Sequence, residues 1–112
     1  MNSAENQSER RRYPRVKVRV PVELRLEGSN NPIGAATSDL SLGGCYVEMM
    51  FTLEKDTKLE MTLRIDGTLL AVARVVTCDP NFGNGIEFEQ MLPEDVEELR
   101  RFLEAVQRQS ET

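Results

Sequence analysis

The sequence predicts a mainly β fold: a small antiparallel β-barrel of five or six short strands, followed by one C-terminal α-helix. Two observations favour the strands, because apolar and polar residues alternate at period two over several stretches and turn-forming residues separate these stretches. A third favours the helix, because the apolar period becomes helical after residue 93. A β-sandwich would also fit, but closure into a barrel removes the unpaired edges of so small a sheet. The length of 112 residues suits one domain.

The first strand is predicted over residues 16–26, where six apolar residues, mostly β-branched, alternate with polar ones. These six are Val16, Val18, Val20, Val22, Leu24 and Leu26. Pro21 has no N–H to donate, so the strand is expected to lie at an edge there or to bend. A short second strand is expected over 33–38 and a third over 45–49, with a turn-rich segment over 39–44 between them.

A hairpin is predicted around Asp66-Gly67. Alternating residues over 59–65 precede this dipeptide, and an apolar, β-rich run over 69–77 follows it. Asp-Gly favours a type I′ turn, which needs positive φ at two successive residues. A short last strand over 85–88 would complete a barrel that spans about residues 16–89.

The C-terminal helix is predicted over residues 93–107. Pro93 is tolerated at the first helical position, and the two acids after it favour the positive end of the helix dipole. One apolar stripe consists of Val96, Leu99, Leu103 and Val106, with Phe102 beside it. We expect this stripe to pack on the barrel and to cover one of its openings. Residues 1–9 and 107–112 are expected to be tails.

The composition argues against several classes of function. The chain has no His, which is the commonest metal ligand and the usual general base near neutral pH, and it lacks common catalytic motifs. We therefore expect no catalytic residues, no metal and no cofactor.

Cys45 and Cys78 are too few for a disulfide scaffold and are expected to be buried, reduced thiols. No apolar run approaches the roughly 20 residues that span a bilayer, and the N-terminus does not resemble a signal peptide. A cytoplasmic protein without membrane insertion is expected.

Positive charge is concentrated near the N-terminus. The chain carries 14 Lys and Arg against 19 Asp and Glu, a net charge of −5, yet residues 10–19 (RRRYPRVKVR) hold six of the basic residues and no acid. The remaining 8 basic and 19 acidic residues give −11. A basic segment on an acidic protein indicates a local anion site, although a solvated arm that aids solubility explains the charge equally well.

Two short motifs add chemistry to this pattern. Arg11 and Arg15 form an RxxxR motif before the first predicted strand, and the planar fork of arginine binds phosphate bidentately and stacks on bases. Asp39, Ser41 and Gly44 form a DxSxxG motif. A carboxylate at Asp39 matches the N1–H and amino donors of guanine, Ser41 adds a hydroxyl, and Gly44 permits close approach of a ligand or a positive φ. On its own, the second motif is better explained as an ordinary turn whose polar side chains bond nearby backbone amides.

Together and in this order, the motifs and the strand pattern resemble a PilZ domain, the bacterial receptor module for cyclic di-GMP. The resemblance covers roughly residues 10–106. It implies a six-stranded antiparallel barrel of split-barrel type, with an N-terminal arm at residues 10–15 that folds over the ligand. It also implies roles for the motif residues: Arg11 and Arg15 hold phosphates and guanine Hoogsteen edges, and Asp39, Ser41 and Gly44 contact guanine. Arg10, just before the motif, is a secondary candidate that would reach a second nucleotide.

Cyclic di-GMP is therefore the expected ligand. Its binding is expected to order the arginine arm, which an effector protein that the sequence does not identify then recognises. One alternative is a PilZ-fold adaptor that binds protein but no nucleotide. A small-barrel nucleic-acid binder is less favoured, since such proteins present stacking aromatics on the sheet. The phenylalanines of this chain (Phe51, Phe82, Phe88 and Phe102) look like core or loop residues, and no nucleic-acid partner is expected.

Overall fold

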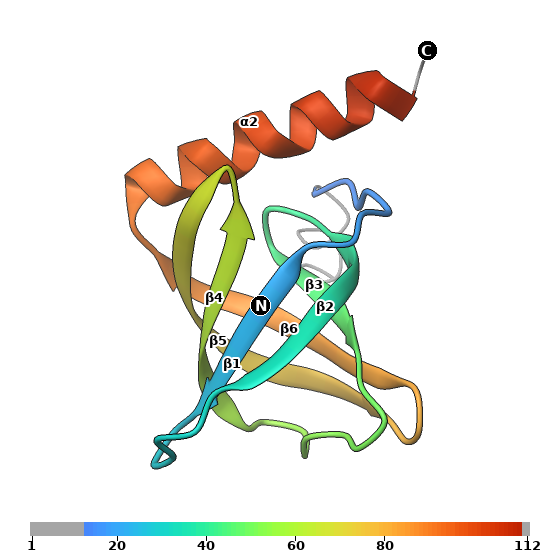
Figure 1. Cartoon of the computed structure of the whole chain (residues 1–112), viewed down its shortest axis with the longest axis vertical. Helices are drawn as coiled ribbons and strands as arrows, with labels where there is room; N and C mark the ends of the chain where they lie inside the picture. The colour runs from blue at the N-terminus through green and yellow to red at the C-terminus, as the bar shows by residue number, and fades with distance from the viewer. Residues whose placement is uncertain (1–12, 111–112) are drawn as a thin grey trace, which may run out of the picture.

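The barrel predicted from the sequence is present, and it is closed (Figure 1). The computed structural model describes residues 13–110 of the chain. Its elements are β1 (Pro21–Leu26), β2 (Ile33–Leu40), β3 (Gly44–Glu48), β4 (Lys58–Ile65), β5 (Gly67–Asp79), β6 (Gly83–Met91) and the helix α2 (Pro93–Ser110). The order around the barrel is β1-β2-β3-β6-β5-β4, and every neighbouring pair is antiparallel. The expected fold class, a six-stranded antiparallel barrel with a C-terminal helix, is confirmed.

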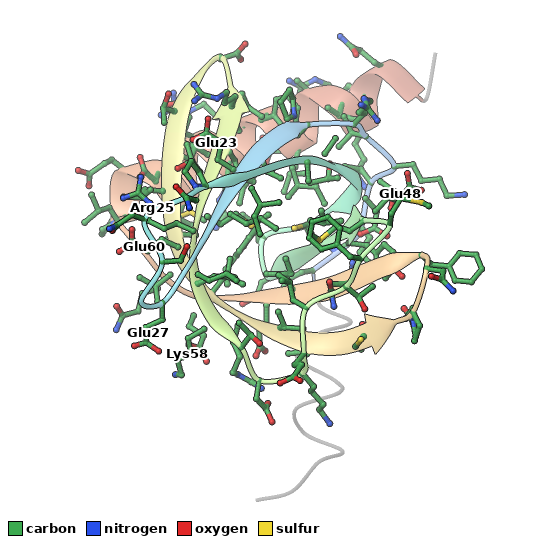
Figure 2. All side chains as sticks on the ribbon, turned by 60° about the horizontal axis from the view of Figure 1, so that its bottom comes forward. Glu23, Arg25, Glu27, Glu48, Lys58 and Glu60 are labelled. Atoms are coloured by element: carbon green, nitrogen blue, oxygen red, sulfur yellow. The ribbon has the colours of Figure 1, made fainter. Side chains whose placement is uncertain are left out.

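Apolar residues at alternate positions of the strands fill the barrel interior. The buried side chains of β4 are Leu59, Met61, Leu63 and Ile65, and those of β5 are Leu69, Ala71, Ala73 and Val75. Charged residues between such positions lie on the outer surface, as Figure 2 shows for Arg25 and Glu60. The two-residue period of the sequence thus arises because successive side chains of a strand point to opposite faces of the sheet, and one face of this sheet is buried.

The first strand is shorter than the sequence predicts, because β1 begins at Pro21. Residues 16–20 still run beside β2, where Val16 exchanges backbone hydrogen bonds with Leu40 (2.9 and 3.0 Å). The hydroxyl of Thr37 interrupts the regular pairing, since it accepts from the Val20 N–H (2.9 Å) and donates to the Val18 carbonyl (2.7 Å). Val16 and Val20 are nevertheless buried, so the alternation predicted burial correctly and the extent of the strand wrongly.

Two connections also differ from their expected form. Asp39 lies in β2 rather than in a turn, and a register shift after Thr37 marks a β-bulge beside it. The hairpin between β4 and β5 forms as expected, with Ile65 paired to Gly67. Its turn is not of type I′, because Asp66 has a φ of 45° whereas the φ of Gly67 is not positive.

The helix α2 lies across one end of the barrel (Figure 1). Leu99 and Leu103 of its apolar stripe are buried in the same core as the barrel side chains, and Phe102 and Val106 pack against that core. The predicted packing of the helix is therefore confirmed. The helix continues to Ser110, so the segment expected to be a C-terminal tail begins inside it. Within the described part of the chain, no helical segment has the length and apolar character that crossing a bilayer requires.

The two cysteines have different environments. Cys45 is buried, and burial raises the pKa of its thiol, so it is an unreactive core residue. Cys78 is exposed, and the prediction of a buried thiol is wrong for this residue. The reason is its position, since the last three residues of β5 are all exposed beyond the barrel interior. Both thiols are free, as expected.

Candidate ligand-binding site

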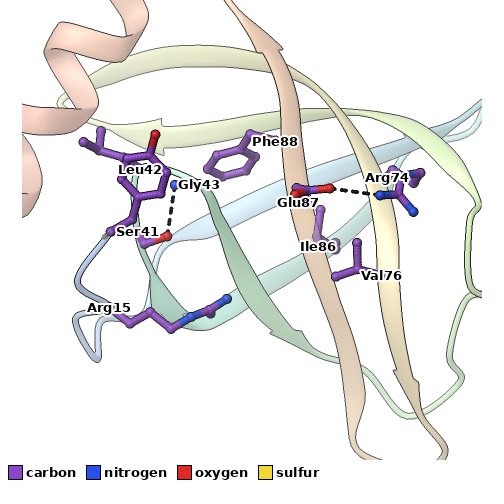
Figure 3. Close-up of a pocket in the computed structure, with 10 residues that line it drawn as sticks. Arg15, Ser41, Leu42, Gly43, Arg74, Val76, Ile86, Glu87 and Phe88 are labelled. Carbon is purple, nitrogen blue, oxygen red and sulfur yellow. Dashed lines mark hydrogen bonds and ion pairs between the residues drawn. The ribbon is translucent and has the colours of Figure 1, made fainter. Parts of the chain in front are cut away.

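The N-terminal segment, the β2–β3 turn and the outer faces of β5 and β6 form a pocket of about 400 Å³ (Figure 3). Its polar lining comes from Arg15, Ser41, Arg74 and Glu87, and its apolar lining includes Tyr13, Leu42, Val76, Ile86 and Phe88. Volumes of this size are typical of small-molecule sites. Because residues of both sequence motifs line it, this pocket is the candidate site.

Arg15 and Asp39 form an ion pair beside the pocket. Arg15 Nη1 donates to Asp39 Oδ1 over 2.6 Å, which joins the two motifs across 24 positions of sequence. The backbone places the pair, since Val16 pairs with Leu40 and these residues directly follow Arg15 and Asp39. The two side chains are 50% and 28% exposed, so both are accessible to a ligand and water screens their attraction.

Ser41 is buried and organises the β2–β3 turn. Its Oγ accepts the N–H groups of Gly43 (3.0 Å) and Gly44 (3.2 Å), and its own N–H donates to the Gly44 carbonyl (2.8 Å). For Ser41, the ordinary-turn interpretation of the motif is therefore correct. Asp39 departs from that interpretation, because its carboxylate bonds to Arg15. Ser41 both shapes the turn and lines the pocket.

The two glycines of this turn permit close packing. A Cβ on Gly44 would clash with the carbonyl oxygen of Ile86, so β3 and β6 would not pair at their present register. A Cβ on Gly43 would lie 2.9 Å from Cδ2 of Tyr13, because the tyrosine ring packs on this backbone. Among the described glycines, positive φ occurs at Gly28, outside this turn. Gly44 thus permits close packing against Ile86 of the neighbouring strand, whereas the expectation was the approach of a ligand. The expected alternative of a positive φ at Gly44 is not observed.

Arg74, which neither motif includes, lines the side of the pocket opposite Arg15 (Figure 3). Its guanidinium forms ion pairs with Asp56 (2.8 Å), Glu87 (3.0 Å) and Glu89 (3.1 Å). The hydrogen bond to Glu89 raises the pKa of Arg74, and the same bond lowers the pKa of Glu89. One feature of the sequence could have pointed to a role for this residue, because Arg74 is the sole charged residue between positions 67 and 78.

Four of the predicted site residues meet here. Arg15 and Ser41 line the pocket, Asp39 binds Arg15, and Gly44 closes the turn that Ser41 organises. Arg10 and Arg11 lie outside the described residues. The site combines an accessible guanidinium, a carboxylate acceptor and apolar walls, which suits a ligand with both an anionic group and a flat ring.

Comparisons with known proteins agree with the fold. The family model described as PilZ domain matches residues 9–105. No curated protein is similar enough to match. The PilZ domain of CeSA from a cellulose-synthesizing bacterium is 23% identical with a TM-score of 0.65, over 84% of this chain and 98% of that one.

Two structures of YcgR from Escherichia coli are similar as well, and both are described as holding c-di-GMP. The first is 20% identical with a TM-score of 0.74 and covers 91% of this chain, which spans 48% of that protein. The second, a PilZ domain, is 17% identical with a TM-score of 0.73 and covers 90% of this chain and 94% of its own. These likenesses support the closed barrel, and the match over residues 9–105 shows that this chain belongs to the PilZ domain family.

Proposed function

We propose that this chain is a cytoplasmic receptor for cyclic di-GMP that binds its ligand without chemical conversion. The observation that carries the proposal is the ion pair of Arg15 and Asp39, which joins the two motifs at one pocket of about 400 Å³. The YcgR structures described with c-di-GMP share this fold and support the choice of ligand.

The proposed contacts follow from the chemistry of each group. Arg15 uses one guanidinium nitrogen for Asp39, so its remaining N–H groups are available to a phosphate. Asp39 accepts the N1–H and amino group of one guanine. Ser41, which lines the pocket, would contact the same guanine, and Gly44 would contact it from the same turn. Arg11 would bind phosphate from the arm, and Arg10 would reach a second nucleotide.

The proposed output is a change at the N-terminal arm. Tyr13 packs on Gly43 and Val16 pairs with Leu40, so the end of the arm nearest the barrel has protein contacts of its own. We propose that ligand phosphates bring residues 10–12 onto the same surface. The surface so completed is the one that an effector protein would recognise.

Calorimetric titration tests this proposal directly. The full chain is titrated with cyclic di-GMP, and with GTP and cyclic GMP as controls that each carry a single guanine. Saturable heat with cyclic di-GMP and little heat with either control is the expected result. A folded protein that gives no heat with cyclic di-GMP would instead favour the adaptor that binds protein alone.

A further inference from the structure

The guanidinium of Arg74 donates hydrogen bonds to three separate carboxylates, which fix the orientation of its plane. Its Nη1 donates to Asp56 (2.8 Å), its Nη2 to Glu87 (3.0 Å) and its Nε to Glu89 (3.1 Å). Every nitrogen of the group thus has a partner, and hydrogen bonds to a guanidinium lie in its plane. These bonds use three of the five N–H donors, one on each nitrogen, and place carboxylates around the edge of the group. The two flat faces of the guanidinium carry none of these bonds.

The carboxylates that hold Arg74 are themselves anchored. Glu87 lies opposite Arg74 in the β5–β6 register. Asp56 sits in the loop after β3, where its N–H donates to the Val75 carbonyl (2.8 Å) and the Val75 N–H donates to the Thr57 carbonyl (2.9 Å). The guanidinium plane is therefore fixed by backbone contacts on both sides of β5, and little further ordering is needed when a ligand binds.

The charge at this wall is unfavourable for a phosphate. Arg74 and Lys58, which is 3.4 Å from Glu89, supply two positive charges, whereas Asp56, Glu87 and Glu89 supply three negative ones. The balance of 2 − 3 is −1. Beside Arg74 the pocket is lined by two apolar residues, Val76 and Ile86, and Ile86 is a buried residue of the barrel core. An uncharged, flat ring suits such a wall, because a guanidinium stacks well on aromatic faces.

We infer that Arg74 is a stacking platform for one guanine base of the ligand, while Arg15 on the opposite side binds phosphate. This inference rests on the proposed function, since it assigns a role within that same site. Among the described residues, the two arginines of the pocket differ in their partners: Arg15 bonds one carboxylate, whereas Arg74 bonds three around the edge of its guanidinium.

Binding of cyclic di-GMP to variants at several salt concentrations tests the inference. Arg74→Lys keeps the charge but lacks the flat face, and we expect it to weaken binding on the order of tenfold, as loss of one base stack does. We expect the dependence of affinity on salt to stay unchanged in this variant, because no phosphate contact is lost. Arg15→Ala should instead reduce the salt slope by about 1. The matched control is Arg64→Lys, which alters an exposed arginine paired with Glu23 (3.0 Å) on β1 and β4, outside the pocket.

A second measurement does not depend on any variant being folded. A guanine stacked on Arg74 shifts the NMR signals of the Arg74 Cδ and Nε protons upfield through its ring current, and those of Arg64 serve as the internal control. An unshifted Arg74, or an Arg74→Lys variant that binds as tightly as the wild type, overturns the inference. A wild-type protein that binds no cyclic di-GMP overturns the proposed function instead, so the two failures are distinguishable.

Discussion

Arg15 and Asp39 bind each other through a 2.6 Å hydrogen bond from Nη1 to Oδ1, although one precedes the first strand and the other lies near the end of the second. Each belongs to a motif whose residues are predicted to contact the ligand. A nucleotide that binds both residues must use the donors of Arg15 and the acceptor positions of Asp39 that their mutual hydrogen bond leaves unused, or replace that bond. The pair is partly exposed, and such pairs contribute about 0–1 kcal/mol to stability.

Replacing Arg15 should therefore separate binding from stability. We expect Arg15→Ala, and likewise Arg11→Ala, to abolish or greatly weaken binding of cyclic di-GMP, because phosphate loses a bidentate partner. The free energy of unfolding should fall by no more than about 1 kcal/mol for Arg15→Ala. Arg15→Lys should substitute poorly, since lysine lacks the planar fork. Calorimetry and thermal melts measure the two effects, and an unfolded Arg15→Ala protein would mark the pair as structural.

Asp39 should make the site selective for guanine. Its carboxylate matches the two donors of guanine, whereas adenine presents an unprotonated N1 to it. Cyclic di-AMP should therefore bind more weakly than cyclic di-GMP by about 2–3 kcal/mol, the cost of leaving buried groups unpaired. Parallel titrations with the two dinucleotides check this prediction. Equal affinities would show that Asp39 serves Arg15 alone.

Ligand binding should reduce the mobility of the arm. The arm carries Arg10, Arg11, Arg12 and Arg15, whose mutual repulsion a ligand with two phosphates would relieve. We expect slower hydrogen exchange and higher NMR order parameters over residues 8–16 in the complex, and an affinity that falls with salt. Equal values with and without ligand would place the signal elsewhere in the protein.

Gly44→Ala should destabilise the barrel. The added Cβ would clash with the Ile86 carbonyl oxygen, and relief of that contact requires β3 and β6 to separate. Overpacking of this kind costs about 1–3 kcal/mol of unfolding free energy. The matched control is Gly34→Ala in β2, where no atom lies within 4 Å of the new Cβ and little change is expected. Chemical denaturation of both variants measures the difference, and equal stabilities would mean that the strands adjust without cost.

Tyr46 should titrate unusually late. Its hydroxyl donates to Asp79 Oδ2 (2.7 Å), and this hydrogen bond raises the pKa of Tyr46 to about 12. The protonated form stabilises the folded state, so this contribution is complete below the ordinary tyrosine pKa of about 10 and is lost as the pH rises through about 12. Ultraviolet absorbance against pH should show this late transition, and Tyr46→Phe should remove it. Asp79→Asn should move the transition to lower pH, and a late transition that persists in that variant would point to a different cause.

The fold class could be predicted from the amino-acid sequence alone, and so could several residues of the candidate site. The alternation of Leu59, Met61, Leu63 and Ile65 predicts a strand with one buried face, and the spacing of Leu99 and Leu103 predicts the packed side of a helix. Both patterns follow from the local geometry of the backbone, so they can be recognised in the sequence without knowing which residues pack against them. Of the motif residues, Arg15 and Ser41 line the candidate pocket, Asp39 bonds to Arg15 beside it, and Gly44 lies in the turn that Ser41 organises.

The partner of each polar group, in contrast, depends on the tertiary structure. The hydroxyl of Thr37 accepts a hydrogen bond from the Val20 N–H, 17 residues earlier, and this contact shortens the first strand. No local sequence pattern predicts it. Arg74 meets carboxylates from a loop and from β6 because the barrel closes at one particular register. Periodicity reflects the backbone of a single strand, whereas hydrogen bonds and ion pairs depend on how separate strands are aligned, and that alignment is set by the packing of the whole barrel.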